Sequence, residues 1–184
     1  MPSDTLRLFF ALPCPTELTT AICIWRDGLA IGGKPVAADN LHLTLAFLGQ
    51  QPRARLEELQ LLAAGIEAPP FELHLDRLGG GRRGLLWLEP SRVPEPLPAL
   101  VGDLQQRLLA AGIGLDTRPF RAHLTLVRHA GARPAEAAPD FAWPVDRFAL
   151  YASETTARGV RHRELGSWPL VPGLQPLRRP GTPR

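Results

Sequence analysis

The stretch NLHLTLAFLG, residues 40–49, decides the fold, because polar and apolar residues alternate along it. Such alternation predicts a β-strand, in which side chains two positions apart leave the same face of the sheet. The side chains of His42 and Thr44 should therefore point together, while the leucines between them point into the core. Part of the pattern returns as HLTLVR, residues 123–128, which again pairs a histidine with a threonine. The repetition predicts two similar halves that each contribute one such strand.

If the two strands face each other, the cleft between them holds two imidazoles and two hydroxyls, with the Arg128 guanidinium at its rim. One imidazole can accept a proton while the other donates one, because an unperturbed histidine titrates near pH ~6.5. The hydroxyls of Thr44 and Thr125 and the guanidinium would hold the non-bridging oxygens of a phosphodiester. These groups predict acid–base hydrolysis at a phosphate by His42 and His123, and the scheme requires no metal.

The same pattern has an alternative interpretation without catalysis. A single histidine and threonine two positions apart is better explained as the solvated face of a strand. Two matching copies with apolar flanks favour a functional pair, although a gene duplication could preserve the pattern without activity. A non-catalytic protein that binds RNA ends or nucleotides in the cleft therefore stays open, and binding without product formation would identify it.

Composition indicates an ordinary globular chain. Its 184 residues, 45% of them hydrophobic, fit one domain or two small lobes that share a core. The apolar runs are shorter than the roughly 18 to 20 residues that span a bilayer, and residues 1–7 do not read as a signal peptide. Cys14 and Cys23 form no CxxC motif, so we expect reduced thiols in a cytoplasmic protein. Arginine supplies nearly all of the positive charge behind the net charge of +3. The planar guanidinium matches phosphate oxygens, but we favour a GC-rich coding bias as the reason for the high arginine content.

The remaining patterns predict further strands and helices. Apolar runs or alternation indicate strands at residues 6–12, 71–77, 84–88, 145–153 and 160–165. Helical spacing of apolar residues indicates helices at residues 16–29, 53–66 and 100–111. We expect the strands at 71–77 and 84–88 to form a hairpin and residues 130–144, rich in Ala and Pro, to form a loop. The proline-rich residues 169–184 should form a partly disordered tail.

Several conspicuous residues receive a structural interpretation. Gly79-Gly80-Gly81 is followed by two arginines rather than by the Lys-Ser/Thr of a phosphate-binding loop, so we assign it to a hairpin turn. His74 lies between two acidic residues on an exposed strand face, and the sequence has no HExxH motif or Cys/His cluster, so we predict no metal. We assign His129 and His162 to the surface. Stacking on a nucleobase is an alternative role for Phe47. Core packing is the role that we favour for it and for the other aromatic residues Phe9, Phe10, Trp87 and Phe120.

Beside these patterns, the sequence resembles the two-histidine phosphoesterases, and specifically the bacterial RNA 2′,3′-cyclic phosphodiesterases, which are also called 2′-5′ RNA ligase-like proteins. The resemblance covers roughly residues 6–168 and is carried, in family order, by RLFFAL at 7–12, PVAADNLHLTLAFLG at 35–49, RPF at 118–120, HLTLVR at 123–128 and LYAS at 150–153. Arg121 and Ala122 stand where relatives often carry His-Pro, so the residues before the second motif depart from the family pattern.

The resemblance implies an α+β fold class: a bilobal, duplicated antiparallel-sheet fold with pseudo-twofold symmetry and a central cleft, in a single domain of residues 1–168. It implies hydrolysis of RNA 2′,3′-cyclic phosphate ends to 2′-phosphate ends. His42 would be the proton donor to the departing 3′ oxygen, and His123 would be the proton acceptor that activates water. Thr44, Thr125 and Arg128 would bind the phosphate. The choice of acid and base rests on the resemblance alone.

The expected partners are RNA ends or nucleotides that carry a 2′,3′-cyclic phosphate. ATP-independent 2′-5′ ligation, the reverse reaction, would be a secondary activity, because water competes with an RNA hydroxyl unless binding positions that hydroxyl. We expect no cofactor, no metal, no membrane association and no obligate protein partner, and we expect a cytoplasmic monomer.

Overall fold

The strands of the two histidine motifs lie side by side in the middle of an antiparallel sheet, with His42 at the start of one and His123 directly before the other. The computed structural model describes residues 4–135 and 137–172. Along these residues the elements are β1 (Thr5–Pro13), α1 (Thr16–Gly28), β2 (Lys34–Pro35), η1 (Ala38–Asn40), β3 (His42–Pro52), η2 (Arg53–Arg55), α2 (Leu56–Ala64), β4 (Phe71–Leu75), β5 (Arg77–Gly80), η3 (Arg82–Gly84), β6 (Leu86–Glu89), α3 (Pro96–Ala110), β7 (Leu124–Arg128), β8 (Phe141–Val145), β9 (Arg147–Thr156) and β10 (Gly159–Pro169).

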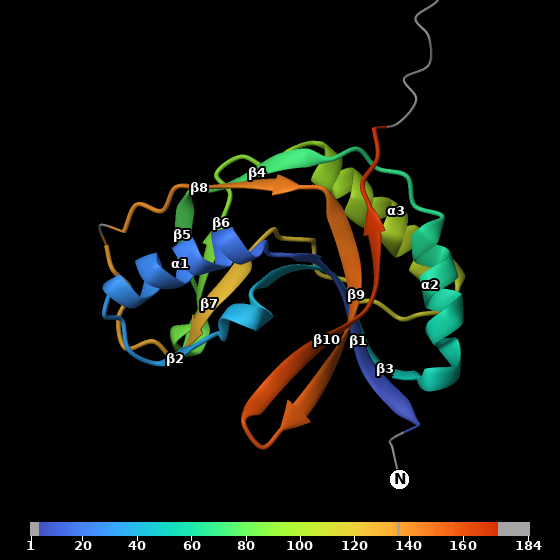
Figure 1. The fold of residues 1–184 in the computed structure, drawn as a ribbon, viewed down its shortest axis with the longest axis horizontal. Helices are drawn as coiled ribbons and strands as arrows, with labels where there is room; N and C mark the ends of the chain where they lie inside the picture. Colours follow the sequence, from blue (N-terminus) through green and yellow to red (C-terminus); the bar gives the residue numbers. More distant parts are fainter. Residues whose placement is uncertain (1–3, 136, 173–184) are drawn as a thin grey trace, which may run out of the picture.

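The main sheet has the strand order β10-β9-β1-β3-β7-β6-β5, with β2 added to β7. Strand β3 pairs with β1 along its whole length, but it meets β7 only at the pair Leu43 and Leu124. From this narrow junction the sheet opens into two arms, one of β1, β9 and β10 and the other of β7, β6 and β5 (Figure 1). The predicted α+β class with antiparallel sheets is confirmed, and the two strands that carry the histidines meet where the arms join.

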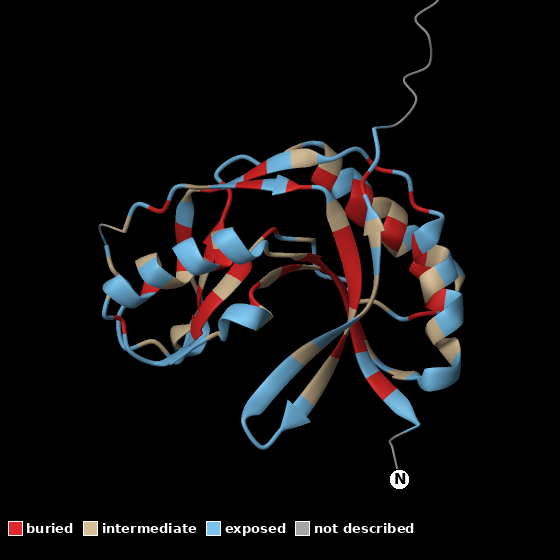
Figure 2. Ribbon diagram, viewed as in Figure 1, coloured by how far each residue is buried: buried red, intermediate tan, exposed pale blue. Residues whose placement is uncertain are grey.

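The helices bury apolar faces against the sheets, as their spacing predicts. Helix α3 buries the apolar side chains Leu97, Leu100, Val101, Leu104 and Leu108. Helices α2 and α3 contact each other at one end of the molecule, whereas α1 lies at the other end and contacts β8 (Figure 1). Buried residues follow the central strands, and the exposed faces of the helices point outward (Figure 2). Within the described residues, every helix is too short or too polar to cross a membrane.

The predicted hairpin between residues 71–77 and 84–88 is wrong in its pairing. Strand β4 instead pairs with β8 in a separate two-stranded sheet, while the hairpin partner of β6 is β5. The chain turns between β4 and β5 at Asp76, whose carboxylate accepts hydrogen bonds from the backbone N–H and the hydroxyl of Ser91.

The loop expected at residues 130–144 is also interrupted, because Phe141, Trp143 and Val145 alternate with smaller residues and form β8. Trp143 is 1% exposed, so its burial stabilises this pairing.

The three-glycine run does not form the turn that we expected. Gly79 and Gly80 lie inside β5, and the chain reverses through η3, where Arg83 adopts a φ of 58° and Gly84 a φ of 67°. A Cβ atom at Gly79 would lie 2.1 Å from Nε1 of Trp87, so only glycine leaves room for the indole at this position. The absence of a side chain at Gly79 therefore allows the Trp87 indole to pack directly against the backbone of β5.

The first residues of the predicted tail belong to the fold. Strand β10 continues to Pro169, and Leu170 is buried. Residues 173–184, on which the rest of that prediction falls, lie outside the described residues. Cys14 and Cys23 are free thiols, in agreement with the absence of a predicted disulfide.

Candidate active site

His42 opens β3 and is held at both ring nitrogens. Its Nδ1 lies 2.6 Å from the backbone carbonyl oxygen of Asn40, and its Nε2 lies 3.0 Å from the hydroxyl oxygen of Thr44. A carbonyl oxygen can only accept, so Nδ1 carries a proton. In the neutral ring Nε2 is then the acceptor, and the Thr44 hydroxyl donates to it. The same Nε2 becomes a donor when the ring is protonated, so it is the nitrogen available for proton transfer.

His123 lies directly before β7 and repeats this arrangement. Its Nδ1 donates to the backbone carbonyl oxygen of Arg121 at 2.8 Å, again two residues earlier in the chain. Its Nε2 has no hydrogen-bond partner within the described residues. The duplication seen in the sequence therefore extends to the bonds that orient both rings. Each histidine has its Nδ1 fixed by a carbonyl oxygen, while Nε2 contacts the Thr44 hydroxyl in His42 and, in His123, has no such partner in the described part of the chain.

The charges of His123 and Arg128 both influence the protonation of His42. Burial lowers the pKa of His42, its bond to the Asn40 carbonyl raises it, and the charges of His123 and Arg128 lower it further, with a net downward shift. Arg128 is exposed at the end of β7 beside Lys34 of β2. Its guanidinium has no hydrogen bond or ion pair with the described residues, so it is available to an anion. Thr125 is half-buried in β7 opposite Trp87.

His162 belongs to this site, and the prediction that it is a surface residue was wrong. Its ring centroid lies 4.9 Å from that of His42 and 4.8 Å from that of Phe9. Burial, together with the charges of His42 and Arg128, lowers the pKa of His162 to about 4. At neutral pH this ring is therefore uncharged and forms a wall beside His42.

Asn40 holds His162 in place across the chain. Its side-chain amide donates to the carbonyl oxygen of Val160 at 2.7 Å, and its side-chain oxygen accepts from the backbone N–H of His162 at 3.1 Å. Two hydrogen bonds thus fix strand β10 next to the first histidine motif. The signal in the sequence was Asn40 itself, a polar residue two positions before His42 on the same alternating face. Its partners could not be found from local pattern, because Val160 and His162 lie on β10, 120 and 122 residues later in the chain.

A cavity of about 580 Å³ opens beside His123 and Thr44. Its wall includes the aromatic side chains of Phe47, Trp87 and Phe120. The core-packing role that we favoured holds for Phe9 and Phe10, which are 3% and 0% exposed, but not for Phe47, which is 45% exposed. The indole of Trp87 lies 5.9 Å from the ring of His123, centroid to centroid. A volume of this size is typical of pockets that bind small ligands such as nucleotides.

Chemically, the site offers two oriented imidazoles, a hydroxyl beside each histidine motif and an unpaired guanidinium. Among residues 4–135 and 137–172, no group of three or more His, Cys, Asp and Glu side chains is placed to hold a metal ion. The fold and this set of groups are those of a two-histidine phosphoesterase.

Comparison with known proteins places the chain in a family. The family model described as the 2′-5′ RNA ligase superfamily matches residues 15–157, and the chain belongs to that superfamily. The RNA 2′,3′-cyclic phosphodiesterase of Escherichia coli K12 is 39% identical over 174 residues, which cover 92% of this chain and 99% of that protein. The protein of the same name from Thermus thermophilus is 33% identical and covers 84% of this chain and 85% of its own length.

Solved structures agree with this assignment. Escherichia coli LigT in its apo form superposes with a TM-score of 0.85 at 38% identity, covering 92% of this chain and all of LigT. LigT complexed with 3′-AMP gives a TM-score of 0.83, with 91% of this chain and 99% of LigT covered. TT0787 of Thermus thermophilus gives 0.76 at 27% identity, with 90% and 98% covered. The resemblance inferred from the sequence segments is thereby confirmed.

Proposed function

We propose that this protein hydrolyses RNA 2′,3′-cyclic phosphate ends to 2′-phosphate ends, with His42 and His123 as a general acid–base pair. The observation that carries the proposal is the matched orientation of the two histidines, each with Nδ1 bound to a carbonyl oxygen two residues earlier. The names of the relatives, RNA 2′,3′-cyclic phosphodiesterase, supply the substrate class. Because the alignments with these relatives cover most of this chain, they support the same substrate class for it.

The reaction assigns one proton transfer to each ring. Nε2 of His123 takes a proton from a water molecule as its oxygen attacks phosphorus opposite the 3′ oxygen. The bond between phosphorus and the 3′ oxygen breaks, and Nε2 of His42 donates its proton to that oxygen. The products are a 2′-phosphomonoester and a free 3′ hydroxyl, and the two histidines have exchanged protonation states. Solvent restores them between turnovers.

The lowered pKa of His42 suits an acid whose proton is needed only when substrate is bound. Burial and the positive charges of His123 and Arg128 disfavour the protonated ring in the free protein. The negative charge of a bound phosphodiester opposes those charges and raises the pKa of His42. Substrate binding therefore increases the protonated fraction of the acid at the moment when it is used.

Thr44, Thr125 and Arg128 complete the proposed site as phosphate ligands. The Thr44 hydroxyl already contacts Nε2 of His42, so it stands beside the position where the reacting oxygens would lie. The Arg128 guanidinium would neutralise the charge that develops on the non-bridging oxygens as the fifth bond to phosphorus forms. The reverse reaction, ATP-independent 2′-5′ ligation, is proposed as a secondary activity. We further propose that the protein works without metal, as a cytoplasmic monomer without an obligate protein partner.

Incubation with adenosine 2′,3′-cyclic phosphate in the presence of EDTA tests the proposal. We expect adenosine 2′-monophosphate as the product, identified by chromatography against the 2′ and 3′ isomers. Formation of the 3′ isomer would mean that the other ester bond is cleaved. Loss of activity on chelation would refute metal independence, and tight binding without any product would favour the non-catalytic alternative.

A further inference from the structure

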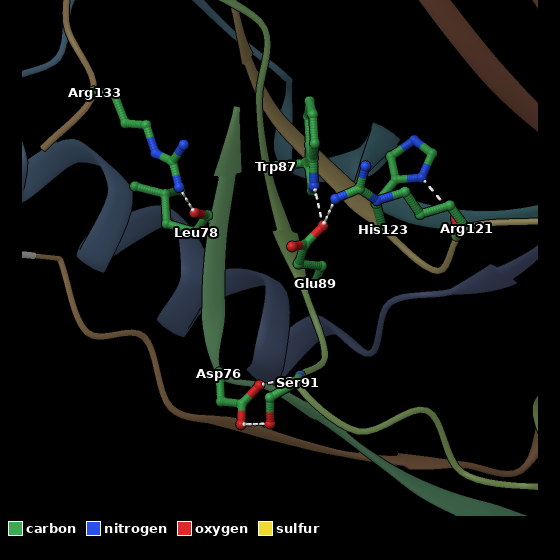
Figure 3. A network of polar contacts seen from close by, with 8 residues as sticks. All are labelled: Asp76, Leu78, Trp87, Glu89, Ser91, Arg121, His123 and Arg133. Carbon is green, nitrogen blue, oxygen red and sulfur yellow. Dashed lines mark hydrogen bonds and ion pairs between the residues drawn. The ribbon is translucent and has the colours of Figure 1, made fainter. Parts of the chain in front are cut away.

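A nearly buried carboxylate lies behind the second histidine motif, and the reaction described above does not use it. The side chain of Glu89, at the end of β6, is 11% exposed and does not line the cavity. One of its oxygens accepts hydrogen bonds from Nε1 of Trp87 at 2.6 Å and from Nη2 of Arg121 at 2.9 Å (Figure 3). Burial raises the pKa of Glu89, but these hydrogen bonds and the charges of Arg121 and Arg77 lower it, with a net downward shift. Glu89 is therefore ionised at neutral pH.

Arg121 connects this carboxylate to His123. Its guanidinium binds Glu89, and its backbone carbonyl oxygen accepts the hydrogen bond from Nδ1 of His123 at 2.8 Å. Figure 3 shows these two bonds on either side of Arg121. The register of the sheet brings the groups together, because Leu88, directly before Glu89, pairs with Leu124, directly after His123. Glu89 thus reaches the imidazole through a single intermediate residue.

The carbonyl oxygen of Arg121 lies in an irregular part of the chain. Residues 119–123 belong to no helix or strand. Among the described residues, none of the backbone-to-backbone hydrogen bonds that fix turns and loops involves this segment. Irregular segments with few such bonds open more easily than strands do. The ion pair with Glu89, at a strand end, therefore limits the positions that the Arg121 carbonyl can take.

The first histidine motif has the same arrangement with different residues. The carbonyl oxygen that binds Nδ1 of His42 belongs to Asn40, whose side chain makes two hydrogen bonds to β10. In each motif the residue two positions before the histidine orients the ring with its backbone and binds another strand with its side chain. Asn40 does so with an amide, whereas Arg121 does so with a guanidinium and a carboxylate partner. The repetition in unlike residues favours a common purpose, which is to hold the carbonyl that orients each ring.

The tautomer of His123 decides whether the ring can act as a base. With a proton on Nδ1, the lone pair of Nε2 is free to accept a proton from water, and with the proton on Nε2 it is not. The hydrogen bond to the Arg121 carbonyl selects the first tautomer. A carbonyl that rotates away would leave both tautomers accessible and would release the orientation of the ring.

We propose that Glu89 is a positioning residue for the general base: it holds the Arg121 carbonyl and thereby keeps His123 in its reactive tautomer and orientation. The inference rests on the proposed function for the role of His123 as the base. It assigns Glu89 no contact with substrate. It also gives a role to the departure from the family pattern at Arg121, because an arginine at this position reaches the carboxylate at the end of β6.

Glu89→Ala tests this role by steady-state kinetics and by nitrogen NMR of the imidazoles. We expect kcat for adenosine 2′,3′-cyclic phosphate to fall by about tenfold, in line with the loss of a group that orients a functional histidine, while KM stays within about twofold. At a pH where His123 is neutral, NMR should show a smaller fraction of its Nδ1–H tautomer. Glu89→Gln should keep kcat within about threefold of the wild type, because its amide oxygen accepts the same two hydrogen bonds.

Arg121→Ala breaks the same ion pair from its exposed side, where the Arg121 side chain is 66% exposed. The tautomer of His123 should shift in this variant as in Glu89→Ala, and adding Glu89→Ala to it should lower kcat no further. Glu58→Ala is the matched control, because it breaks the ion pair of Glu58 with Arg55, and neither residue lines the cavity. It should change neither kcat nor the tautomer. Circular dichroism would confirm that each variant is folded.

The possible outcomes separate positioning from charge and from the reaction itself. An unchanged kcat and tautomer in Glu89→Ala would overturn the proposal. A Glu89→Gln variant as slow as Glu89→Ala would also overturn it, because the charge of Glu89 rather than its hydrogen bonds would then be responsible. The tautomer of His123 reports on the ion pair without any turnover. A wild-type protein that forms no product would therefore refute the proposed function alone.

Discussion

Replacing Gly79 with alanine should destabilise the protein, although Gly79 itself makes no side-chain contact. The new Cβ would lie 2.1 Å from Nε1 and 2.4 Å from Cε2 of Trp87, well inside van der Waals contact. The indole must move away, and its 2.6 Å hydrogen bond to Glu89 would break. The perturbation thus reaches the carboxylate of Glu89, which receives one of its two side-chain hydrogen bonds from Trp87 and the other from Arg121.

The magnitude follows from two opposing effects. Loss of a hydrogen bond to a charged group costs about 1.5–3 kcal/mol. Against this, alanine reduces the conformational entropy of the unfolded chain, which contributes about 0.4–1 kcal/mol of stability wherever the folded backbone accepts it. We therefore expect Gly79→Ala to lower the free energy of unfolding by about 1.5 kcal/mol, because the broken bond outweighs the entropy gain.

Urea denaturation followed by circular dichroism measures this loss, and another glycine supplies a matched control. A Cβ at Gly102, inside α3, would meet nothing within 4 Å. Gly102→Ala should therefore stabilise the protein by about 0.5–1 kcal/mol, since alanine is also the better helix former. In a Trp87→Ala background the Gly79→Ala substitution should cost nothing, because its clash is gone. A Gly79→Ala variant as stable as the wild type would refute the close packing of the Trp87 indole against Gly79.

Three further predictions concern the site itself. Thr44→Ala or Thr125→Ala should lower kcat/KM by about tenfold, because each removes one hydrogen bond to the phosphate. Steady-state kinetics with adenosine 2′,3′-cyclic phosphate measures this loss, and an unchanged kcat/KM would mean that the hydroxyl does not bind the phosphate. The pH profile of kcat/KM should be bell-shaped, and its basic limb should report loss of the proton from His42, which begins at lower pH than for an ordinary histidine because burial and positive neighbours lower its pKa. Arg128→Ala removes one of those charges and should shift the basic limb to higher pH while lowering the maximum; an unmoved limb would contradict the assignment of His42 as the acid. Asn40→Ala removes the two hydrogen bonds to β10 and should lower the free energy of unfolding by about 1 kcal/mol. It should also increase hydrogen exchange at the His162 amide, and unchanged exchange would show that Asn40 does not fix the strand.

Local alternation was sufficient to predict the strands that carry the candidate site. The face shared by His42 and Thr44 follows from the period of two along a strand, and the same rule applies to His123 and Thr125. The helices could also be predicted, because their buried leucines recur at helical spacing. These features depend on neighbours within one element, which the sequence displays directly.

Features that depend on distant neighbours could not be predicted in this way. Strand β4 alternates as expected, but nothing in residues 71–75 identifies β8 as its partner. The sequence pattern assigns His162 to the surface, and only the structure shows that Asn40, at the end of η1, binds its backbone N–H. The glycine run at 79–81 reads as a turn until Trp87 is placed over it. In each case the deciding contact joins segments whose pairing local pattern does not encode.

Turnover by His42→Ala, His123→Ala and the double variant, measured with adenosine 2′,3′-cyclic phosphate, tests the central claim most directly. If the two imidazoles act as one acid–base pair, each single variant should lose roughly 10²–10⁴-fold in kcat, and the double variant should lose much less than the product of the two losses. Binding of adenosine 2′-monophosphate should persist in all of them. A near-normal rate in either single variant would contradict the account.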